Sequence, residues 1–284
     1  MEALLLVLVT MLLSAQQIAQ KEYDKRSRGG AYTYVLVAVL AAIAVFFVTS
    51  GGALEFRADV ALYSLLFAVG YSTSMITGFL AIKTGSLSLS ALIMQYSLFI
   101  PAAYGIIALG EEPKITIFIG VVLLVVSLML VTLKGKEEGI RPTLKWALFA
   151  GLSFVGNGTC ATVQKVQQFD FGGQYKSEFM IMGLGISVCF LLLLVLVYER
   201  RDLAYNLRKG GLISACSGAC NGTCNFLIMV LVGMLPASVM YPVISAGGTI
   251  ATSLAALLIY REKLSRKQLL GLGLGILSII ALNL

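Results

Sequence analysis

The sequence contains no histidine and few charged residues. Only 12% of the 284 residues are charged, against about a quarter in soluble domains. Histidine is the most common metal ligand in proteins and the most common general base. Its absence weakens an interpretation as a metalloenzyme or hydrolase, so we predict no catalytic residues, no metal site and no cofactor.

Long hydrophobic runs are what the sequence has in abundance. It is 58% hydrophobic with a mean hydropathy of +0.92. Ten apolar stretches approach the ~20 residues that a helix needs to cross a bilayer. They lie at about 3–20, 31–49, 60–80, 86–108, 115–133, 143–163, 178–198, 211–232, 237–259 and 267–284. The sequence therefore predicts an all-α integral membrane protein with ten transmembrane helices and no room for a soluble domain.

Acidic side chains are missing from the centres of these stretches. All fourteen Asp and Glu residues lie in predicted loops or at span ends. A carrier of organic cations needs a buried carboxylate or an aromatic cage to replace the hydration of its cargo. The pattern disfavours an organic-cation exporter and favours a neutral, zwitterionic or mildly anionic solute.

The net charge of +7 comes from basic residues spread over the loops, which is not typical of a nucleic-acid-binding surface. Loops that follow odd-numbered spans hold 17 Lys and Arg residues, and the other loops hold 4. The positive-inside rule then places both termini outside. We predict a multi-pass protein of the cell membrane, the inner membrane in a bacterium, with lipid and a small solute as its partners and no nucleic acid.

The C-terminal part of the sequence repeats a stretch from its middle. Glu111 recurs as Glu262 and Gly120 as Gly271, both at an offset of 151 residues. Each predicted repeat holds five spans, and an odd number inverts the second repeat in the membrane. Inverted repeats place a solute site at their interface and open it alternately to each side. The predicted repeats cover residues 1–137 and 138–284.

In this layout the sequence resembles the drug/metabolite transporter superfamily, in its EamA-like branch. The resemblance rests on the ten spans and on the paired segments from Gly110-Glu111 to Gly120 and from Arg261-Glu262 to Gly271. It implies a helical carrier whose spans one, three, four, six, eight and nine line a central cavity. Family members move amino acids, nucleotide sugars, sugar phosphates, nucleosides and drugs, so the resemblance names no substrate. Many relatives are described with cytoplasmic termini, unlike the orientation that the charges of this chain predict.

Polar residues inside the spans form the predicted binding site. An unpaired polar group is expensive in hydrocarbon, so such residues should face the interior of the bundle. Steps of three and four residues place them on single helix faces. The alternative is that they form hydrogen bonds between helices, worth about 0.6 kcal/mol each. The predicted solute-binding residues are Gln16, Gln20, Lys21, Ser74, Ser97, Asn157, Cys160, Gln164, Lys165, Asn221, Asn225, Tyr241 and Ser245.

Two pairs of residues have more specific interpretations. Lys21 and Lys165 end spans one and six, where they either extend to the headgroup layer or supply positive charge for an anion at the mouths of the cavity. Pro101 and Pro242 lie inside spans four and nine. Because proline bends a helix, these two residues are predicted hinges.

The expected function is that of a secondary transporter that works by alternating access as a monomer or homodimer. The sequence has no nucleotide-binding segment, which excludes direct coupling to ATP. Because no acidic residue or histidine lies at mid-membrane, facilitated diffusion or solute exchange is at least as plausible as proton coupling. The alternatives are a multidrug exporter of organic cations and a non-transporting accessory membrane protein.

Overall fold

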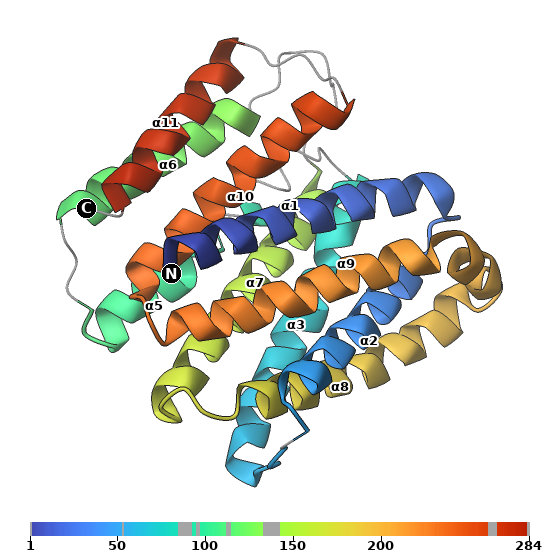
Figure 1. Ribbon diagram of the computed structural model, residues 1–284. Helices are drawn as coiled ribbons and strands as arrows, with labels where there is room; N and C mark the ends of the chain where they lie inside the picture. Colours follow the sequence, from blue (N-terminus) through green and yellow to red (C-terminus); the bar gives the residue numbers. More distant parts are fainter. Residues whose placement is uncertain are drawn as a thin grey trace.

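The computed structural model describes residues 2–52, 54–84, 93–94, 97–111, 115–132, 143–260 and 266–282. This part of the chain is all-helical (Figure 1). The helices are α1 (Glu2–Arg26), α2 (Ala31–Thr49), α3 (Ala58–Thr84), α5 (Phe99–Ala108), α6 (Ile115–Thr132), α7 (Leu144–Asp170), α8 (Lys176–Leu194), the π-helical η1 (Val195–Glu199), α9 (Leu203–Val232), α10 (Ala237–Tyr260) and α11 (Arg266–Leu282).

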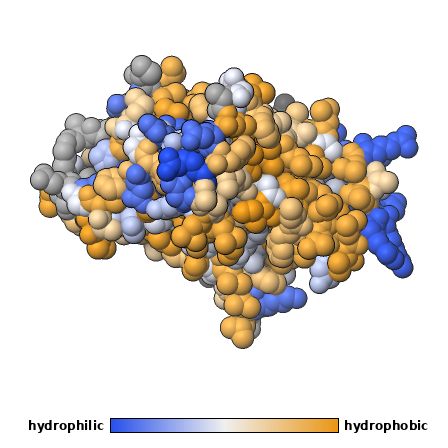
Figure 2. Space-filling view, turned by 90° about the horizontal axis from the view of Figure 1, so that it is seen from below, coloured by the Kyte–Doolittle hydropathy of each residue, from blue (hydrophilic) through white to orange (hydrophobic). Residues whose placement is uncertain are grey.

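Several of these helices are long and apolar enough to cross a bilayer. In the described part of the chain six qualify: α1, α2, α3, α7, α8 continued by η1, and α9. Large apolar side chains such as Val48, Leu144 and Leu212 are exposed on the outside of the bundle. Figure 2 shows hydrophobic residues covering most of the face seen from below. Such a surface is stable against lipid tails and unfavourable in water, as expected of a multi-pass membrane protein.

Three long helices extend beyond the predicted apolar spans. α1 continues to Arg26, α7 continues to Asp170, and α9 begins at Leu203. Charged side chains can lie at the headgroup level while the backbone keeps its helical hydrogen bonds. Hydropathy therefore marks the hydrocarbon-spanning part of a helix rather than its ends. As a consequence, Lys165 lies within α7 and not at its end.

The predicted fourth span is interrupted in the structure. A turn at residues 97–98 precedes α5, and Pro101 lies in the first turn of that helix. Proline has no N–H to donate and its ring clashes with the carbonyl four residues earlier, here that of Ser97. The helix therefore begins at Phe99. Residues 86–92 and 95–96 of the predicted span lie outside the described residues.

The helices pack in pairs that are distant in sequence. α3 packs against α7, α2 and α1 pack against α9, and α6 lies beside α11 at one edge of the bundle (Figure 1). Glycines allow two of these close approaches. A Cβ atom at Gly156 would lie 2.7 Å from the carbonyl oxygen of Gly70 on α3, and one at Gly218 would lie 2.1 Å from that of Ala38 on α2. Helices α7 and α9 are thereby held against the middle of the bundle.

Hydrogen bonds tie α6 to α11 in a reciprocal way. The hydroxyl of Ser127 on α6 donates to the carbonyl oxygen of Gly271 on α11 at 2.6 Å, and the hydroxyl of Ser278 on α11 donates to that of Gly120 on α6 at 2.7 Å. Both are buried. The two antiparallel helices are thus joined at two levels by the same kind of contact.

Candidate polar cavity

A cavity of about 250 Å³ lies between the helices. Side chains of α1, α2, α3, α7, α9 and α10 line it, together with residues just before α5. Nine of the predicted binding residues are among them: Gln16, Gln20, Ser74, Asn157, Cys160, Gln164, Asn221, Asn225 and Tyr241. These nine residues come from five of the six helices that line the cavity: α1, α3, α7, α9 and α10.

A chain of side-chain amides crosses one side of this cavity. Gln164 Nε2 on α7 donates to Asn225 Oδ1 on α9 at 2.9 Å. Asn225 Nδ2 donates to Asn221 Oδ1 at 3.2 Å, and Asn221 Nδ2 donates to Gln16 Oε1 on α1 at 2.9 Å. The hydroxyl of Tyr71 on α3 also donates to Asn221 Oδ1, at 3.2 Å. Predicted residues of three helices, together with Tyr71 of α3, which was not predicted, thus form one connected network.

Other polar residues of the lining bond to neighbouring helices. Asn157 Nδ2 on α7 donates to Ser97 Oγ at 2.6 Å, and Ser153 Oγ donates to the carbonyl oxygen of Ser74 on α3 at 3.2 Å. The Tyr241 hydroxyl on α10 donates to the carbonyl oxygen of Ala161 on α7 at 2.9 Å. Both uses that the sequence left open for these residues, hydrogen bonding between helices and lining of a cavity, therefore occur at the same place.

Aromatic residues of the lining were missed by the sequence analysis. Tyr34, Phe67, Tyr71 and Phe79 all line the cavity, and the rings of Phe67 and Tyr71 stack with centroids 5.4 Å apart. Tyr34 belongs to α2, which the family resemblance does not place among the cavity-lining spans. In an apolar span an aromatic residue gives no contrast with its neighbours, so only the polar residues stood out.

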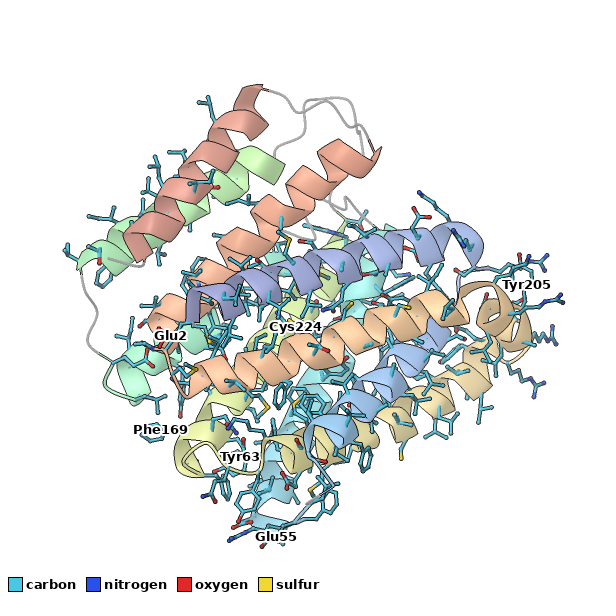
Figure 3. All side chains as sticks on the ribbon, viewed as in Figure 1. Glu2, Glu55, Tyr63, Phe169, Tyr205 and Cys224 are labelled. Carbon is cyan, nitrogen blue, oxygen red and sulfur yellow. The ribbon has the colours of Figure 1, made fainter. Side chains whose placement is uncertain are left out.

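The lining that the structure describes contains sulfur-bearing as well as aromatic side chains and no charged ones. Cys224, labelled near the middle of α9 in Figure 3, is buried and faces the cavity with Cys160 of α7. Within the described part of the chain, none of the lining residues is Asp, Glu, Lys or Arg. Among the described residues no group of three or more His, Cys, Asp or Glu side chains could hold a metal ion.

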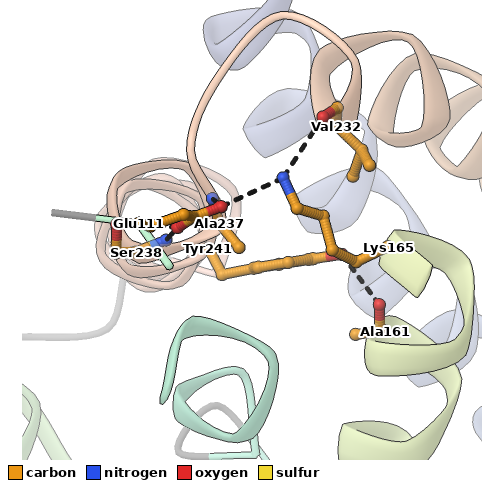
Figure 4. Close-up of polar contacts among 7 residues, drawn as sticks. All are labelled: Glu111, Ala161, Lys165, Val232, Ala237, Ser238 and Tyr241. Carbon is orange, nitrogen blue, oxygen red and sulfur yellow. Dashed lines mark hydrogen bonds and ion pairs between the residues drawn. The ribbon is translucent and has the colours of Figure 1, made fainter. Parts of the chain in front are cut away.

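A buried ion pair lies close to Ala161 and Tyr241, two residues of the cavity lining (Figure 4). Lys165, next in sequence to the lining residue Gln164, places its Nζ 3.1 Å from Glu111 Oε1. The same ammonium donates to the carbonyl oxygen of Val232, at the end of α9, at 3.4 Å. The two charged side chains are 9% and 13% exposed, so little water screens the pair.

The Glu111 carboxylate also caps the start of α10. It accepts hydrogen bonds from the backbone N–H of Ala237 at 2.9 Å and from the N–H and hydroxyl of Ser238, both at 3.0 Å. The first N–H groups of a helix have no partner within it and favour negative charge. Glu111 therefore joins the segment after α5 to α7 and α10, and through Lys165 to the end of α9.

These contacts change the acidity of Glu111. Burial by itself would raise its pKa, but the N–H groups of Ala237 and Ser238, followed by Lys165, outweigh burial and hold the pKa of the carboxyl below its ordinary value. The carboxylate is therefore the favoured form in the folded protein. The sequence placed Glu111 in a loop and gave no sign of this partner, because Lys165 is 54 positions further along the chain.

Three further predicted residues, Ser97, Lys165 and Ser245, are not part of the lining. Lys165 is engaged by Glu111 and Val232, Ser97 contacts the lining residue Asn157, and Ser245 is buried in α10. Of the predicted hinges, Pro242 lies inside α10 and Pro101 at the start of α5. The side chain of Lys21 and the whole of Glu262 lie outside the described residues.

Comparisons with known proteins show the fold and no family. No protein-family model and no curated protein matches the sequence. One solved structure, described only as a crystal structure of a protein, superposes with a TM-score of 0.81 over 100% of this chain and 98% of its own. Only 10% of the aligned residues are identical. The chain therefore has a helical architecture that occurs in a solved protein, and that likeness carries no information about activity.

Proposed function

We propose that this chain is a secondary transporter that moves a small polar organic solute across a membrane by alternating access. The observation that carries the proposal is the cavity inside the bundle, lined by Gln16, Asn157, Gln164, Asn221 and Asn225. Polar side chains within a membrane protein are expensive to bury and typically mark a solute pathway. With Gln20, six side-chain amides surround this one space, more than helix packing alone requires.

The proposed architecture is ten transmembrane helices in two inverted repeats, with α1 to α6 equivalent to α7 to α11. The reciprocal bonds between α6 and α11 support it, because Ser278 is 151 positions after Ser127 and Gly271 is 151 after Gly120. Helix packing supports it too. In the proposed repeats α1 is equivalent to α7, α2 to α8 and α3 to α9. The contact of α3 with α7 then corresponds to that of α9 with α1, and the contact of α2 with α9 corresponds to that of α8 with α3; all four contacts occur. A twofold axis in the membrane plane accounts for both observations.

The Lys165–Glu111 pair is the proposed closure at one end of the cavity. It joins segments from both proposed repeats, since Glu111 follows α5, whereas Lys165, Val232 and Ala237 belong to α7, α9 and α10. Rocking one repeat against the other would have to separate these groups. By the charge count of the loops, this end faces the outside, so the arrangement fits a state closed to that side.

The family and the location are part of the same proposal. We assign the chain to the EamA-like branch of the drug/metabolite transporters on its paired Glu–Gly motif, and to the cell membrane with both termini outside on its loop charges. An exporter of organic cations is less well supported, since no lining residue that the structure describes is acidic.

Solute exchange in liposomes tests the proposal. A panel of amino acids, nucleosides, sugar phosphates, carboxylates and quaternary amines is first ranked by thermal stabilisation of the purified protein. The best solute is then loaded into proteoliposomes, and uptake of its labelled form is measured against empty liposomes. A transporter gives saturable exchange that Asn221→Leu on the cavity side of α9 reduces and that Leu212→Ala on the exposed side of α9 preserves. Exchange that never saturates, or that both variants leave unchanged, would instead indicate an accessory protein.

A further inference from the structure

The polarity of the amide chain is fixed by one backbone group. Asn225 Nδ2 donates to the backbone carbonyl oxygen of Asn221 at 2.9 Å, and a carbonyl oxygen can only accept. The side-chain oxygen of Asn225 is therefore the atom that accepts from Gln164. The same Nδ2 lies 3.2 Å from Asn221 Oδ1, so the amide nitrogen of Asn221 must be the atom that faces Gln16.

The hydrogen-bonded chain of amides ends in a donor that has no partner. Because Gln16 Oε1 accepts from Asn221, the free end of the Gln16 amide is Nε2. This atom is buried and has no hydrogen-bond partner within the described part of the chain. Leaving such a donor unpaired costs about 1–3 kcal/mol. A solute that offers an acceptor oxygen to Gln16 would remove that cost.

The tyrosines of the cavity add apolar surface rather than further donors. Each hydroxyl already has a partner: that of Tyr34 is 2.6 Å from Ser217 Oγ, that of Tyr71 bonds to Asn221, and that of Tyr241 bonds to Ala161. Their rings, together with those of Phe67 and Phe79, are available for apolar contact with a flat solute. A cavity of about 250 Å³ has room for a solute with one ring.

A charged solute meets no counter-charge among the described residues of the cavity. The described lining has no charged side chain, and the nearby charges of Lys165 and Glu111 are directed at each other. Burial of an unpaired ion is strongly unfavourable. The part of the lining that the structure describes thus favours a neutral solute over a zwitterionic or mildly anionic one.

We propose that the cavity binds an uncharged solute with a flat apolar body and a carbonyl-type acceptor oxygen, to which Gln16 Nε2 donates. The inference rests on the proposed transport function for its biological meaning, but it concerns binding and can be tested without transport. It names the solute class of the site, and Gln16 as the residue that determines its specificity.

Four ring compounds of the same size test the class directly. Benzamide is neutral with an acceptor oxygen, benzoate is its anionic counterpart, benzamidine is its cationic counterpart, and toluene has no polar group. Binding of labelled benzamide to the protein in lipid nanodiscs is measured after subtraction of empty nanodiscs, with the other three as competitors. We expect saturable binding of benzamide, and competition by the other three that is at least about tenfold weaker, as loss of one well-placed hydrogen bond or burial of one charge implies.

Two substitutions at Gln16 test the residue. Gln16→Glu keeps an oxygen that can accept from Asn221 but replaces the donor with a carboxylate oxygen. The affinity of the variant for benzamide should therefore fall, and its affinity for benzamidine should rise, each by about tenfold or more. Gln16→Met should bind benzamide more weakly and should bind none of the other three compounds more tightly. Leu8→Ala, on the exposed side of α1, is the control and should bind as the wild type does.

Each outcome decides between the alternatives. Stronger binding of benzoate, benzamidine or toluene to the wild type, or no binding of benzamide, overturns the solute class. Unchanged benzamide binding in Gln16→Glu overturns the role of Gln16. Should both Gln16 variants fail to fold, the ranking of the four compounds on the wild type still tests the class. Benzamide binding without saturable exchange in liposomes would refute transport alone, and saturable exchange of charged solutes only would refute this inference alone.

Discussion

The Lys165–Glu111 pair makes a quantitative prediction about stability. Lys165→Met keeps the length of the side chain and removes its charge, which leaves the buried Glu111 carboxylate without its ammonium. Removal of one partner from a buried ion pair costs about 3–5 kcal/mol. Glu111 keeps the N–H groups of Ala237 and Ser238 and the hydroxyl of Ser238, and its side chain is 13% exposed. We therefore expect a loss near the lower end of that range, about 3 kcal/mol.

The double variant Lys165→Met/Glu111→Gln should recover part of this loss. Replacing the carboxylate with an amide removes the uncompensated charge, although it also weakens the cap of α10. The effects of two substitutions at residues in direct contact typically differ from additivity by about 0.5–3 kcal/mol. The double variant should accordingly be more stable than Lys165→Met alone.

Thermal unfolding in detergent measures both effects. The single tryptophan, Trp146, is buried near the start of α7, the helix that carries Lys165 towards its other end, so its fluorescence reports on the unfolding of that helix. With about 2–4 °C per kcal/mol, Lys165→Met should melt roughly 6–12 °C below the wild type. The exposed Lys209→Met should melt within about 2 °C of it. Equal melting temperatures for the two lysine variants, or a further drop on adding Glu111→Gln, would refute the description of this pair as a buried, stabilising contact.

Three further predictions follow from the described contacts. Because the pKa of Glu111 lies below its ordinary value of 4.5 in the folded state, its stabilisation is present above that value and is lost as the pH falls through the folded pKa; the difference in melting temperature between wild type and Glu111→Gln should therefore shrink on acidification, and a constant difference would contradict this. Gly218→Val places a Cβ atom 2.1 Å from a carbonyl oxygen of α2 and should destabilise by about 1–3 kcal/mol or more, whereas Gly211→Val in open space should not; thermal melts of both variants test this. Ser127→Ala and Ser278→Ala each remove one of two equivalent bonds, so both should cost about 0.6 kcal/mol with additive effects in the double variant, and clearly unequal costs would count against the proposed twofold relation of α6 and α11.

The sequence located much of the cavity because of the physics of hydrocarbon. A polar side chain in an apolar span is stable only where it faces other polar groups or water. The stripe of Asn157 and Gln164 on one helix, and of Asn221 and Asn225 on another, therefore had to face the interior, and the structure places all four on the cavity. The same reasoning predicted an all-helical membrane protein, because a long apolar run with few charges is typical of a transmembrane helix.

What only the tertiary structure decided is which groups meet. The sequence held Lys165 and Glu111, but no local pattern predicts that residues on separate segments form an ion pair that caps a third helix. Tyr34 and Phe67 gave no signal either, since an aromatic residue in an apolar span resembles its neighbours until packing turns it toward a cavity. Local spacing determines the face of a helix on which a residue lies. The direction in which that face points, and the donor that is left unpaired there, depend on contacts between residues far apart in the chain.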